Sequence, residues 1–418
     1  MTQRFIYDQA PMRVYWETTN ACDLACRHCR AEARPERDPL ELSTAEGRAL
    51  FERLAAFGSP LPHVVLTGGD PLKRDDLFEL IAIARGLGFG VSVAPSATPL
   101  LTTDAVRKLK EAGVDAISLS LDGANAEHHD AIRGIPGTYE RTLAAGAAAR
   151  EAGLPFQVNT LVCEETLADL PAIYDRVLAM GAARWSLFFL VTVGRGSVLQ
   201  PVSQEKAEEL LQWVAGLTAQ RKPGRGGLVI TTTEAPQLRR VVAEQKKAAA
   251  HAMGDVQSAA RPMGDSMSAR PANAAMGDVQ SGSRPGADAT AARPTNAPMG
   301  GPGGAPNGHG SAHHGAGIRD GNGILFISNV GDICPSGFLE MPVGNVRKDD
   351  IVAVYREAPL FRELREPDHF GGRCGHCEYR FSCGGSRARA FSASGDPMAE
   401  DPLCPHVPEP HAHSLPMI

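Results

Sequence analysis

Short apolar segments alternate with longer helix-like segments through the first half of the chain, and this pattern most constrains the fold. Strands are predicted at 13–19, 63–69, 90–96, 115–123, 156–162 and 184–191, and each is followed by a predicted helix that usually ends in glycine. Such spacing predicts a parallel sheet with right-handed crossovers. Six βα units are too few to close an eightfold barrel. We therefore expect an α/β fold, an open partial (β/α)6 barrel, with ligands at the carboxyl ends of its strands.

Composition narrows the class of protein. The chain has 418 residues, 43% of them hydrophobic, and a formal net charge of -6, which argues against a nucleic-acid partner. The N-terminus has no apolar signal segment, and no apolar run approaches the roughly 20 residues that span a bilayer. We expect a cytoplasmic protein without a membrane partner. In that compartment the nine cysteines are better interpreted as metal ligands or buried thiols than as disulfides.

Three regions follow from the pattern. Residues 1–247 hold the predicted barrel. Residues 248–317 contain no Leu, Ile or aromatic residue, so they cannot bury enough apolar surface to offset the entropy cost of ordering. This composition predicts a disordered low-complexity linker. Residues 318–418 begin with a predicted hairpin turning at 329–331, continue with a helix at 348–365, and end in a segment rich in glycine and cysteine. Small modules rich in glycine and cysteine usually need a bound metal or covalent cross-links for stability.

Two groups of cysteines have the spacing of metal ligands. Cys22, Cys26 and Cys29 follow the first predicted strand as C-x3-C-x2-C, where a βα barrel builds its active site. Thiolates suit iron–sulfur clusters and zinc, and three of them leave one metal position open. The alternatives are a zinc site completed by His28 and inert thiols. The second group, with the spacing C-x2-C-x5-C-x20-C, supplies four ligands and also allows zinc: Cys374, Cys377, Cys383, Cys404.

The first group and its surroundings resemble the radical SAM superfamily, whose motif is C-x3-C-x-φ-C; His28 stands where an aromatic residue is usual. The resemblance implies that the three thiolates hold a 4Fe–4S cluster and that S-adenosylmethionine binds its fourth iron. It further implies reductive cleavage to a 5'-deoxyadenosyl radical, which abstracts hydrogen from a substrate. A reductant such as flavodoxin or ferredoxin would be the partner.

Further segments resemble the contacts that this family makes with S-adenosylmethionine. "TGGDP" resembles the family's GGE motif, which implies a role for Gly68, Gly69 and Asp70 at the methionine amino group. "SLSLDG" implies that Ser120 and Asp122 contact the ribose. Arg133 in "HDAIRGIPGTY" is expected to face the carboxylate, and Asn159 in "VNTLV" the adenosine.

The C-terminal group resembles the SPASM extension, which implies a second, auxiliary 4Fe–4S cluster. A full SPASM domain has seven cysteines and two auxiliary clusters. Here Cys334 holds the first position, but Asp349 and Asp350 stand where the next cysteine belongs, and Arg387 replaces another. We therefore expect two clusters in the whole chain and an unligated Cys334, with direct contact between Cys334 and substrate as the alternative.

The substrate is less constrained. "YWETTNACDLACRHCR" and "CGGSRARA" look closest to enzymes of haem d1 and alternative haem biosynthesis, which implies a tetrapyrrole side chain as substrate. The alternatives are a SPASM-type maturase of a ribosomal peptide and a non-enzymatic iron–sulfur carrier or redox scaffold. Arg387 and Arg389 are candidates for binding tetrapyrrole carboxylates, or for holding their loop to the barrel. Glu234 is a candidate proton donor or acceptor, or a helix N-terminal charge.

Overall fold

The computed structural model describes residues 5–219, 227–259 and 317–409. Its central element is a ten-stranded sheet with the order β10-β9-β8-β1-β2-β3-β4-β5-β6-β7. Its first seven strands by sequence are parallel: β1 (Arg13–Thr19), β2 (His63–Gly68), β3 (Val91–Val93), β4 (Ala116–Ser120), β5 (Phe156–Val162), β6 (Arg184–Phe189), β7 (Val229–Thr233). The partial barrel is confirmed, and β7 adds a parallel strand to the six predicted.

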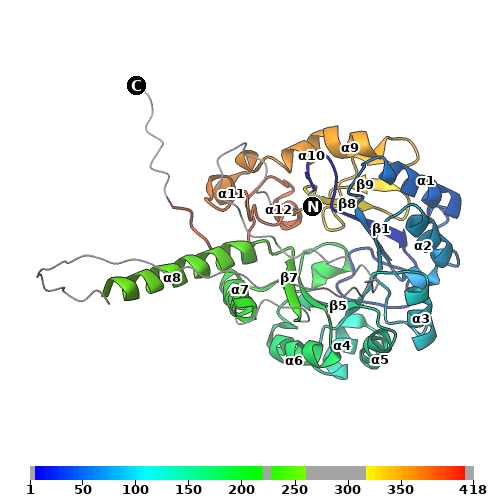
Figure 1. Ribbon diagram of the computed structural model, residues 1–418, viewed down its shortest axis with the longest axis horizontal. Coiled ribbons are helices and arrows are strands. Elements are labelled where there is room, and N and C mark those ends of the chain that lie inside the picture. The colour runs from blue at the N-terminus through cyan, green and yellow to red at the C-terminus, as the bar shows by residue number, and fades with distance from the viewer. Residues whose placement is uncertain (1–4, 220–226, 260–316, 410–418) are drawn as a thin grey trace, which may run out of the picture. The chain divides into compact units, whose positions relative to one another are not determined.

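Helices connect these strands, and Figure 1 shows them around the outside of the sheet. They are α1 (Thr44–Ala55), α2 (Leu77–Gly86), α3 (Thr103–Glu111), α4 (Ala126–Arg133), α5 (Thr138–Glu151), α6 (Leu170–Met180) and α7 (Gln204–Ala219). Short 3-10 turns occur at η1 (Pro71–Lys73), η2 (Leu167–Asp169) and η3 (Gly194–Val198). Ser43 caps α1 and forms a capping box with Glu46, which fixes where this helix starts. Helix α4 was not predicted, and its last residue is the candidate Arg133.

The C-terminal region extends the same sheet. Strand β8 (Ile324–Ile327) lies parallel to β1 and turns through Gly331 into the antiparallel β9 (Asp332–Cys334), which pairs with β10 (Gly344–Asn345). The predicted hairpin is therefore present, and its first strand joins the barrel sheet. The predicted helix at 348–365 is two helices, α9 (Ile351–Glu357) and α10 (Pro359–Glu363), because Pro359 begins a new one. Turn η4 (Pro367–His369), α11 (Gly372–His376) and α12 (Arg387–Ser394) complete the module.

Helix α8 (Gln237–Ala259) passes the boundary at 248 that the sequence predicts for the linker. Residues 245–309 form a unit separate from the rest of the chain, and only the continuation of α8 is described in it. The remainder of the predicted linker, 260–316, lies outside the described residues. The linker itself stays a prediction.

The two faces of each barrel strand have different surroundings. Trp16 on β1 is fully buried and packs edge-on against Phe51 of α1, while Trp185 on β6 packs against Tyr174 and Trp213. Side chains alternate along a strand, so on β1 and β6 the residues directly before and after each tryptophan face the concave side of the sheet. That side carries polar residues and positions the candidate site.

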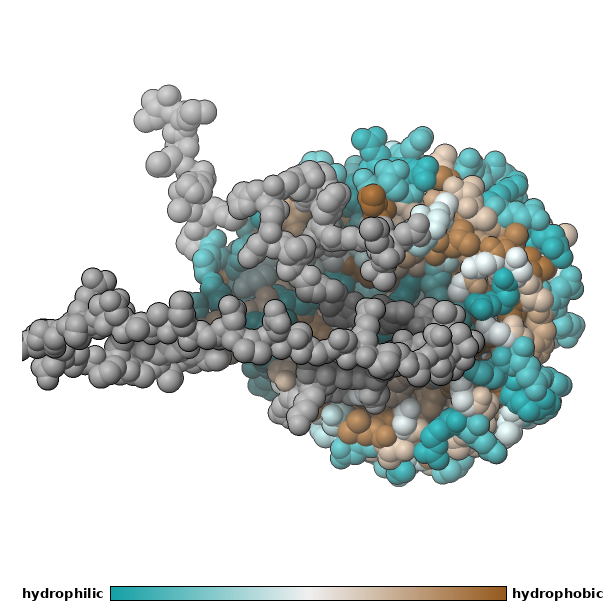
Figure 2. Space-filling model, viewed as in Figure 1, coloured by the Kyte–Doolittle hydropathy of each residue, from teal (hydrophilic) through white to brown (hydrophobic). Residues whose placement is uncertain are grey.

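On the coloured part of the face in Figure 2, hydrophilic and hydrophobic residues alternate in small groups. Among the described helices, none combines the length and apolar character needed to cross a bilayer.

Candidate functional site

A cavity of about 180 Å³ lies at the carboxyl ends of the strands, beside the loop that follows β1. Cys22, Cys26 and Cys29 all line it. Cys22 and Cys26 are buried, and Cys29 is partly exposed. The cavity is completed by residues from the loops after β2, β3 and β6 and from strands β4 and β5: Thr67, Gly68, Gly69, Ala94, Pro95, Ser96, Ser118, Ser120, Asn159 and Arg195, among others.

The glycine loop after β2 is bonded directly to the cysteine loop. The amide of Gly69 donates to the carbonyl of Thr19 (2.8 Å), and the amide of Asp70 donates to the carbonyl of Ala21 (2.7 Å). A Cβ on Gly69 would lie 2.4 Å from the Ala21 carbonyl oxygen, and Gly68 has φ +144. The close approach of the two loops therefore requires glycine at both positions.

Asp70 lies behind this loop and not in the cavity lining. It is fully buried, and its carboxylate accepts hydrogen bonds from the Leu72 amide (3.1 Å) and the Thr98 hydroxyl (2.7 Å). The Ser96 amide donates to it as well (3.3 Å). Burial raises its pKa. Asp70 thus ties η1 to the loop after β3, and its carboxylate is engaged by the protein itself.

Of the candidate ligand contacts on β4, on β5, on α4 and after β4, some line the cavity and one lies outside its lining. Ser120, Asn159 and Arg133 line the cavity. Asp122 is buried beneath it, forms an ion pair with Arg133, and accepts a hydrogen bond from the Leu161 amide (2.7 Å). One guanidinium nitrogen of Arg133 also lies 3.8 Å from the Cys26 sulfur. Asp122 is therefore placed to orient Arg133, not to contact a ligand in the cavity.

Arg195 and Ser96 also line the cavity, and sequence reasoning did not find them. Arg195 in η3 donates to the carbonyls of Cys26 (3.0 Å) and Ala33 (3.1 Å), so it braces the cysteine loop. The Ser96 hydroxyl donates to the Gly69 carbonyl (2.7 Å) and lies 3.6 Å from the Cys22 sulfur. Both residues follow strands in segments that match no motif, and only the position after a strand pointed to them.

The cavity has the donors that an anionic ligand needs. Among the described residues, three buried nitrogens around it have no hydrogen-bond partner: Arg133 Nε, Arg195 Nη2 and His28 Nδ1. Burial lowers the pKa of His28 to about 4, so its ring is neutral near pH 7. A carboxylate would satisfy the two guanidinium donors.

The spacing of the sulfurs argues against a single zinc ion. Tetrahedral zinc with bonds of about 2.3 Å holds its sulfurs about 3.8 Å apart. In the part of the chain that the structure describes, no three of Cys22, Cys26, His28 and Cys29 bring their ligand atoms within 4.8 Å of one another. The wider arrangement fits a cluster of several irons better than one small ion.

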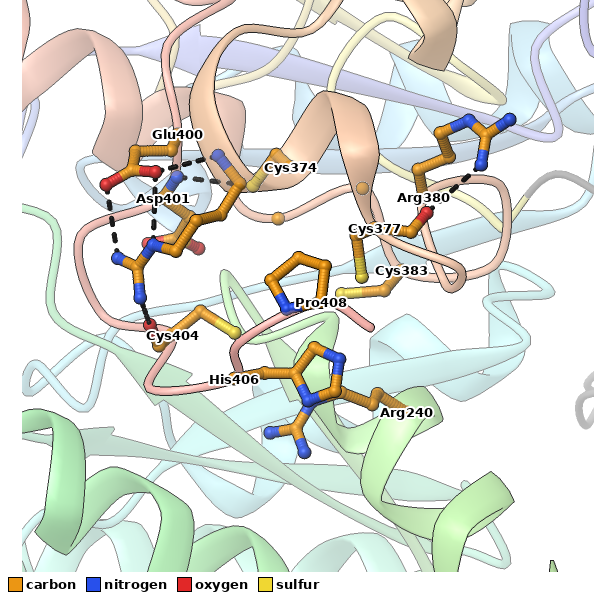
Figure 3. A pocket seen from close by; sticks show the side chains of 13 residues that line it. Arg240, Cys374, Cys377, Arg380, Cys383, Glu400, Asp401, Cys404, His406 and Pro408 are labelled. Carbon is orange, nitrogen blue, oxygen red and sulfur yellow. Dashed lines mark hydrogen bonds and ion pairs between the residues drawn. The ribbon is translucent and has the colours of Figure 1, made fainter. Parts of the chain in front are cut away.

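The four C-terminal cysteines line a second hollow, drawn in Figure 3. Cys374 accepts hydrogen bonds at sulfur from the Asp401 amide (3.4 Å) and from Arg387 (3.6 Å), and Cys377 accepts one from the Tyr379 amide (3.4 Å). Within the described residues, these sulfurs also form no group of three inside 4.8 Å. A group of that size exists at the edge of the hollow, where Cys377 meets Glu378 and His406.

The positions where the SPASM pattern is broken have other roles. Asp350 caps α9 by accepting from the Val352 amide (2.8 Å), and Asp349 accepts from the Asn345 amide (2.7 Å). Cys334 is 2% exposed, and burial raises the pKa of its thiol to about 12. None of these side chains lines either cavity.

Arg387 and Arg389 hold their loop in place. Arg387 is fully buried and donates to the carbonyls of Pro397 (3.1 Å) and Ala399 (2.7 Å) as well as to the Cys374 sulfur. Arg389 forms an ion pair with Asp401 (3.1 Å) and donates to the Glu234 carbonyl (2.5 Å). The terminal nitrogens of both guanidinium groups are thus engaged inside the protein, while the Nε of each has no partner among the described residues. Of the two interpretations that the sequence left open, these contacts favour the structural one.

Glu234 lies at the end of β7, in an unusual backbone conformation with φ +58. Its carboxyl accepts from the Ser386 hydroxyl (2.5 Å), which links the barrel to α12. Burial and the neighbouring charge of Asp320 raise its pKa to about 8. It lines neither cavity, and it begins no helix, since α8 starts three residues later.

Comparison with known proteins identifies the family to which the chain belongs. Residues 16–177 match the model of the radical SAM superfamily. The AdoMet-dependent heme synthase of Oleidesulfovibrio alaskensis is 34% identical over 94% of this chain and 87% of its own length. The chain belongs to the radical SAM superfamily.

The radical SAM fold is shared with proteins of low sequence similarity. The crystal structure of Streptococcus suis SuiB bound to S-adenosylmethionine has a TM-score of 0.66 at 15% identity, and the match covers 95% of this chain and 78% of SuiB. The pre-heme d1 synthase of Dinoroseobacter shibae is 28% identical over 94% of this chain and 85% of its own length. As a radical SAM enzyme, this protein uses S-adenosylmethionine and a 4Fe–4S cluster.

Proposed function

We propose that this radical SAM enzyme modifies a side chain of a tetrapyrrole. The observation that carries the proposal is similarity along nearly the whole chain, at 34% identity, to an AdoMet-dependent heme synthase. A further whole-length relative, a pre-heme d1 synthase, supports the same substrate class. SuiB supports the fold alone at 15% identity, so it does not favour a peptide substrate.

The cavity beside β1 is the proposed site of S-adenosylmethionine. Cys22, Cys26 and Cys29 would hold the 4Fe–4S cluster, which supplies the electron that cleaves S-adenosylmethionine. Arg133 and Arg195 offer free guanidinium nitrogens to its carboxylate. The backbone of Gly68 and Gly69 and the side chains of Ser120 and Asn159 would contact the rest of the molecule.

Asp70 and Asp122 support this site from behind. Asp122 fixes the guanidinium of Arg133, and Asp70 fixes the loops after β2 and β3. Both are therefore proposed as positioning residues, whereas the sequence predicted ligand contacts for them.

Cys374, Cys377, Cys383 and Cys404 are proposed to hold the auxiliary 4Fe–4S cluster. Four thiols border one hollow, and their sulfurs are too far apart for one zinc ion without rearrangement. Burial raises the pKa of the Cys383 thiol to about 12, so a bound cation is what makes its thiolate available. With four protein ligands this cluster has no open iron, which suits electron transfer or support of the fold.

Two measurements on anaerobically reconstituted protein test these assignments. Reduction with flavodoxin or dithionite in the presence of S-adenosylmethionine should release 5'-deoxyadenosine; no release from protein with intact clusters would contradict the enzymatic function. Iron analysis should give about eight irons per chain, and about four in the Cys374→Ala/Cys377→Ala variant. About four irons together with one zinc would instead show a zinc site at the C-terminal cysteines.

The substrate class needs its own test. Iron-coproporphyrin and sirohaem derivatives should bind to the reconstituted protein, and the 5'-deoxyadenosyl radical should abstract a hydrogen atom from them. With a deuterated substrate, transfer of deuterium into 5'-deoxyadenosine would detect this abstraction. Absence of both binding and transfer, with S-adenosylmethionine cleavage intact, would exclude these tetrapyrroles and leave the peptide alternative.

A further inference from the structure

Two arginines on the concave face of the barrel form no ion pair with any residue that the structure describes. They are Arg13, the first residue of β1, and Arg184, the first residue of β6. On β1 the residues that pack against helices are Val14 and Trp16, and on β6 they are Trp185 and Leu187. Alternation along the strands therefore directs both arginines toward the concave side.

Neither guanidinium is compensated there. Among the residues that the structure describes, no side-chain hydrogen bond or ion pair involves Arg13 or Arg184, although Arg184 is only 5% exposed. Burial lowers the pKa of Arg184, and the next cause is the positive charge of Arg13. Guanidinium stays charged at any ordinary pH, so the buried Arg184 lacks the counter-charge that buried ions usually have, and Arg13 beside it is partly buried.

The other buried arginines among the described residues each donate at least one side-chain hydrogen bond, to a carboxylate or, as with Arg319 and Arg365, to backbone carbonyls. Arg133 is paired with Asp122, and Arg30 is paired with Glu17. Arg240 has two carboxylates near it. The missing partner at Arg13 and Arg184 is therefore a local property of the concave face.

Arg184 lies below the proposed S-adenosylmethionine cavity on the same face of the sheet, and neither arginine is among the residues that line the cavity. Asn159 lines that cavity and accepts a hydrogen bond from Gln157 (2.6 Å). Gln157 is in register with Arg184, and Asn159 is in register with Ser186. Because a strand rises about 3.3 Å per residue, the backbone of Arg184 lies roughly 7 Å below that of Ser186 along β6. A substrate reaching from the cavity down the concave face would meet Arg184 first, and Arg13 is near enough for its charge to lower the pKa of Arg184.

We propose that Arg184 and Arg13 bind carboxylate groups of the substrate and thereby place its reacting side chain at the S-adenosylmethionine cavity. Arginine pairs recognise carboxylates through paired hydrogen bonds, and tetrapyrroles carry carboxylates on short side chains at the edge of the ring. The inference rests on the proposed tetrapyrrole substrate and adds which protein groups select it. It assigns this role to arginines of the barrel, and not to Arg387 and Arg389 near the C-terminal cysteines.

The test compares a porphyrin acid with its ester. Iron-coproporphyrin and its fully esterified methyl form are titrated into reconstituted full-length protein, and binding is followed by visible absorption. Wild-type protein should bind the acid more tightly than the ester. Arg184→Gln should weaken binding of the acid at least about tenfold and leave binding of the ester unchanged. Arg13→Gln should act in the same direction, and Arg184→Lys should restore part of the affinity.

The controls separate this inference from the proposal on which it rests. Arg107→Gln removes an exposed arginine of α3 that is paired with Asp104 and Glu111, and it should bind both porphyrins as wild type does. Equal affinity of wild-type protein for acid and ester, or unchanged acid binding in both Gln variants, would overturn the arginine assignment alone. If wild-type protein releases 5'-deoxyadenosine but binds neither porphyrin, the tetrapyrrole assignment fails together with it. The acid–ester comparison in wild type and Arg13→Gln remains decisive if Arg184→Gln does not fold.

Discussion

Substitution of Gly69 by alanine tests whether the glycine loop must approach the cysteine loop as closely as the structure shows. The new Cβ would lie 2.4 Å from the carbonyl oxygen of Ala21 and 2.7 Å from its carbonyl carbon, where ordinary contacts begin at 3.4 Å. The two loops must therefore separate by about 1 Å, and Ala21 directly precedes Cys22. A displacement of 1 Å in an active site can cost about 100-fold in rate. We expect Gly69→Ala to release 5'-deoxyadenosine about 100-fold more slowly per intact cluster.

The matched control is Gly86→Ala at the end of α2, where a Cβ would meet nothing within 4 Å. Its rate and iron content should equal those of wild type. The assay is anaerobic release of 5'-deoxyadenosine, quantified by chromatography and divided by the iron bound to each variant. If Gly69→Ala, with full iron, cleaves S-adenosylmethionine at the wild-type rate, the close approach of these loops does not matter for the reaction and the reasoning is refuted.

Two further predictions concern groups outside the cavity. Burial and the charge of Asp320 raise the pKa of Glu234 to about 8 in the folded protein. The folded state therefore favours the neutral carboxyl. Its contribution to the free energy of unfolding is complete below about pH 4.5 and is lost as the pH rises through about 8. Glu234→Gln should therefore show a smaller fall in unfolding midpoint between about pH 5.5 and about pH 8.5, measured in urea, and parallel pH curves for the two proteins would contradict this. Cys334→Ala should keep about eight irons per chain, since this thiol lines neither cavity; loss of about four irons would show that Cys334 is a ligand.

Local patterns in the sequence predicted the barrel well, because each βα unit is defined by neighbouring residues. The hairpin turn at Gly331 is also local and was predicted correctly. Two features of the sheet depend on pairing between distant segments. Strand β7 was missed because "VITTT" is short and only moderately apolar, and the pairing of β8 with β1 joins residues about 300 positions apart.

Only part of the candidate site was predicted, because contacts between distant segments decide which side chains reach the cavity. Motifs identify which loop contains a residue but not the direction of each side chain. Gly68 and Gly69 line the cavity, while the adjacent Asp70 turns back into the protein to bond Thr98. Arg195 was missed because an arginine in "VGRGS" has no distinguishing spacing, and its role depends on a contact with the carbonyl of Cys26.

Charge compensation explains which arginines are available to a ligand. Proximity to the C-terminal cysteines made Arg387 and Arg389 attractive candidates in the sequence, yet every contact they make is with the protein itself, through backbone carbonyls, a sulfur and Asp401. A guanidinium that already holds several hydrogen bonds gains less from a substrate carboxylate, because binding would exchange one set of hydrogen bonds for another; among the described residues only the Nε atom of each lacks a partner. Arg13 and Arg184 have no such contacts with the residues that the structure describes, so a carboxylate would supply the charge and the hydrogen bonds that they lack there. Recognition of an acidic substrate is therefore expected where the fold has left positive charge uncompensated.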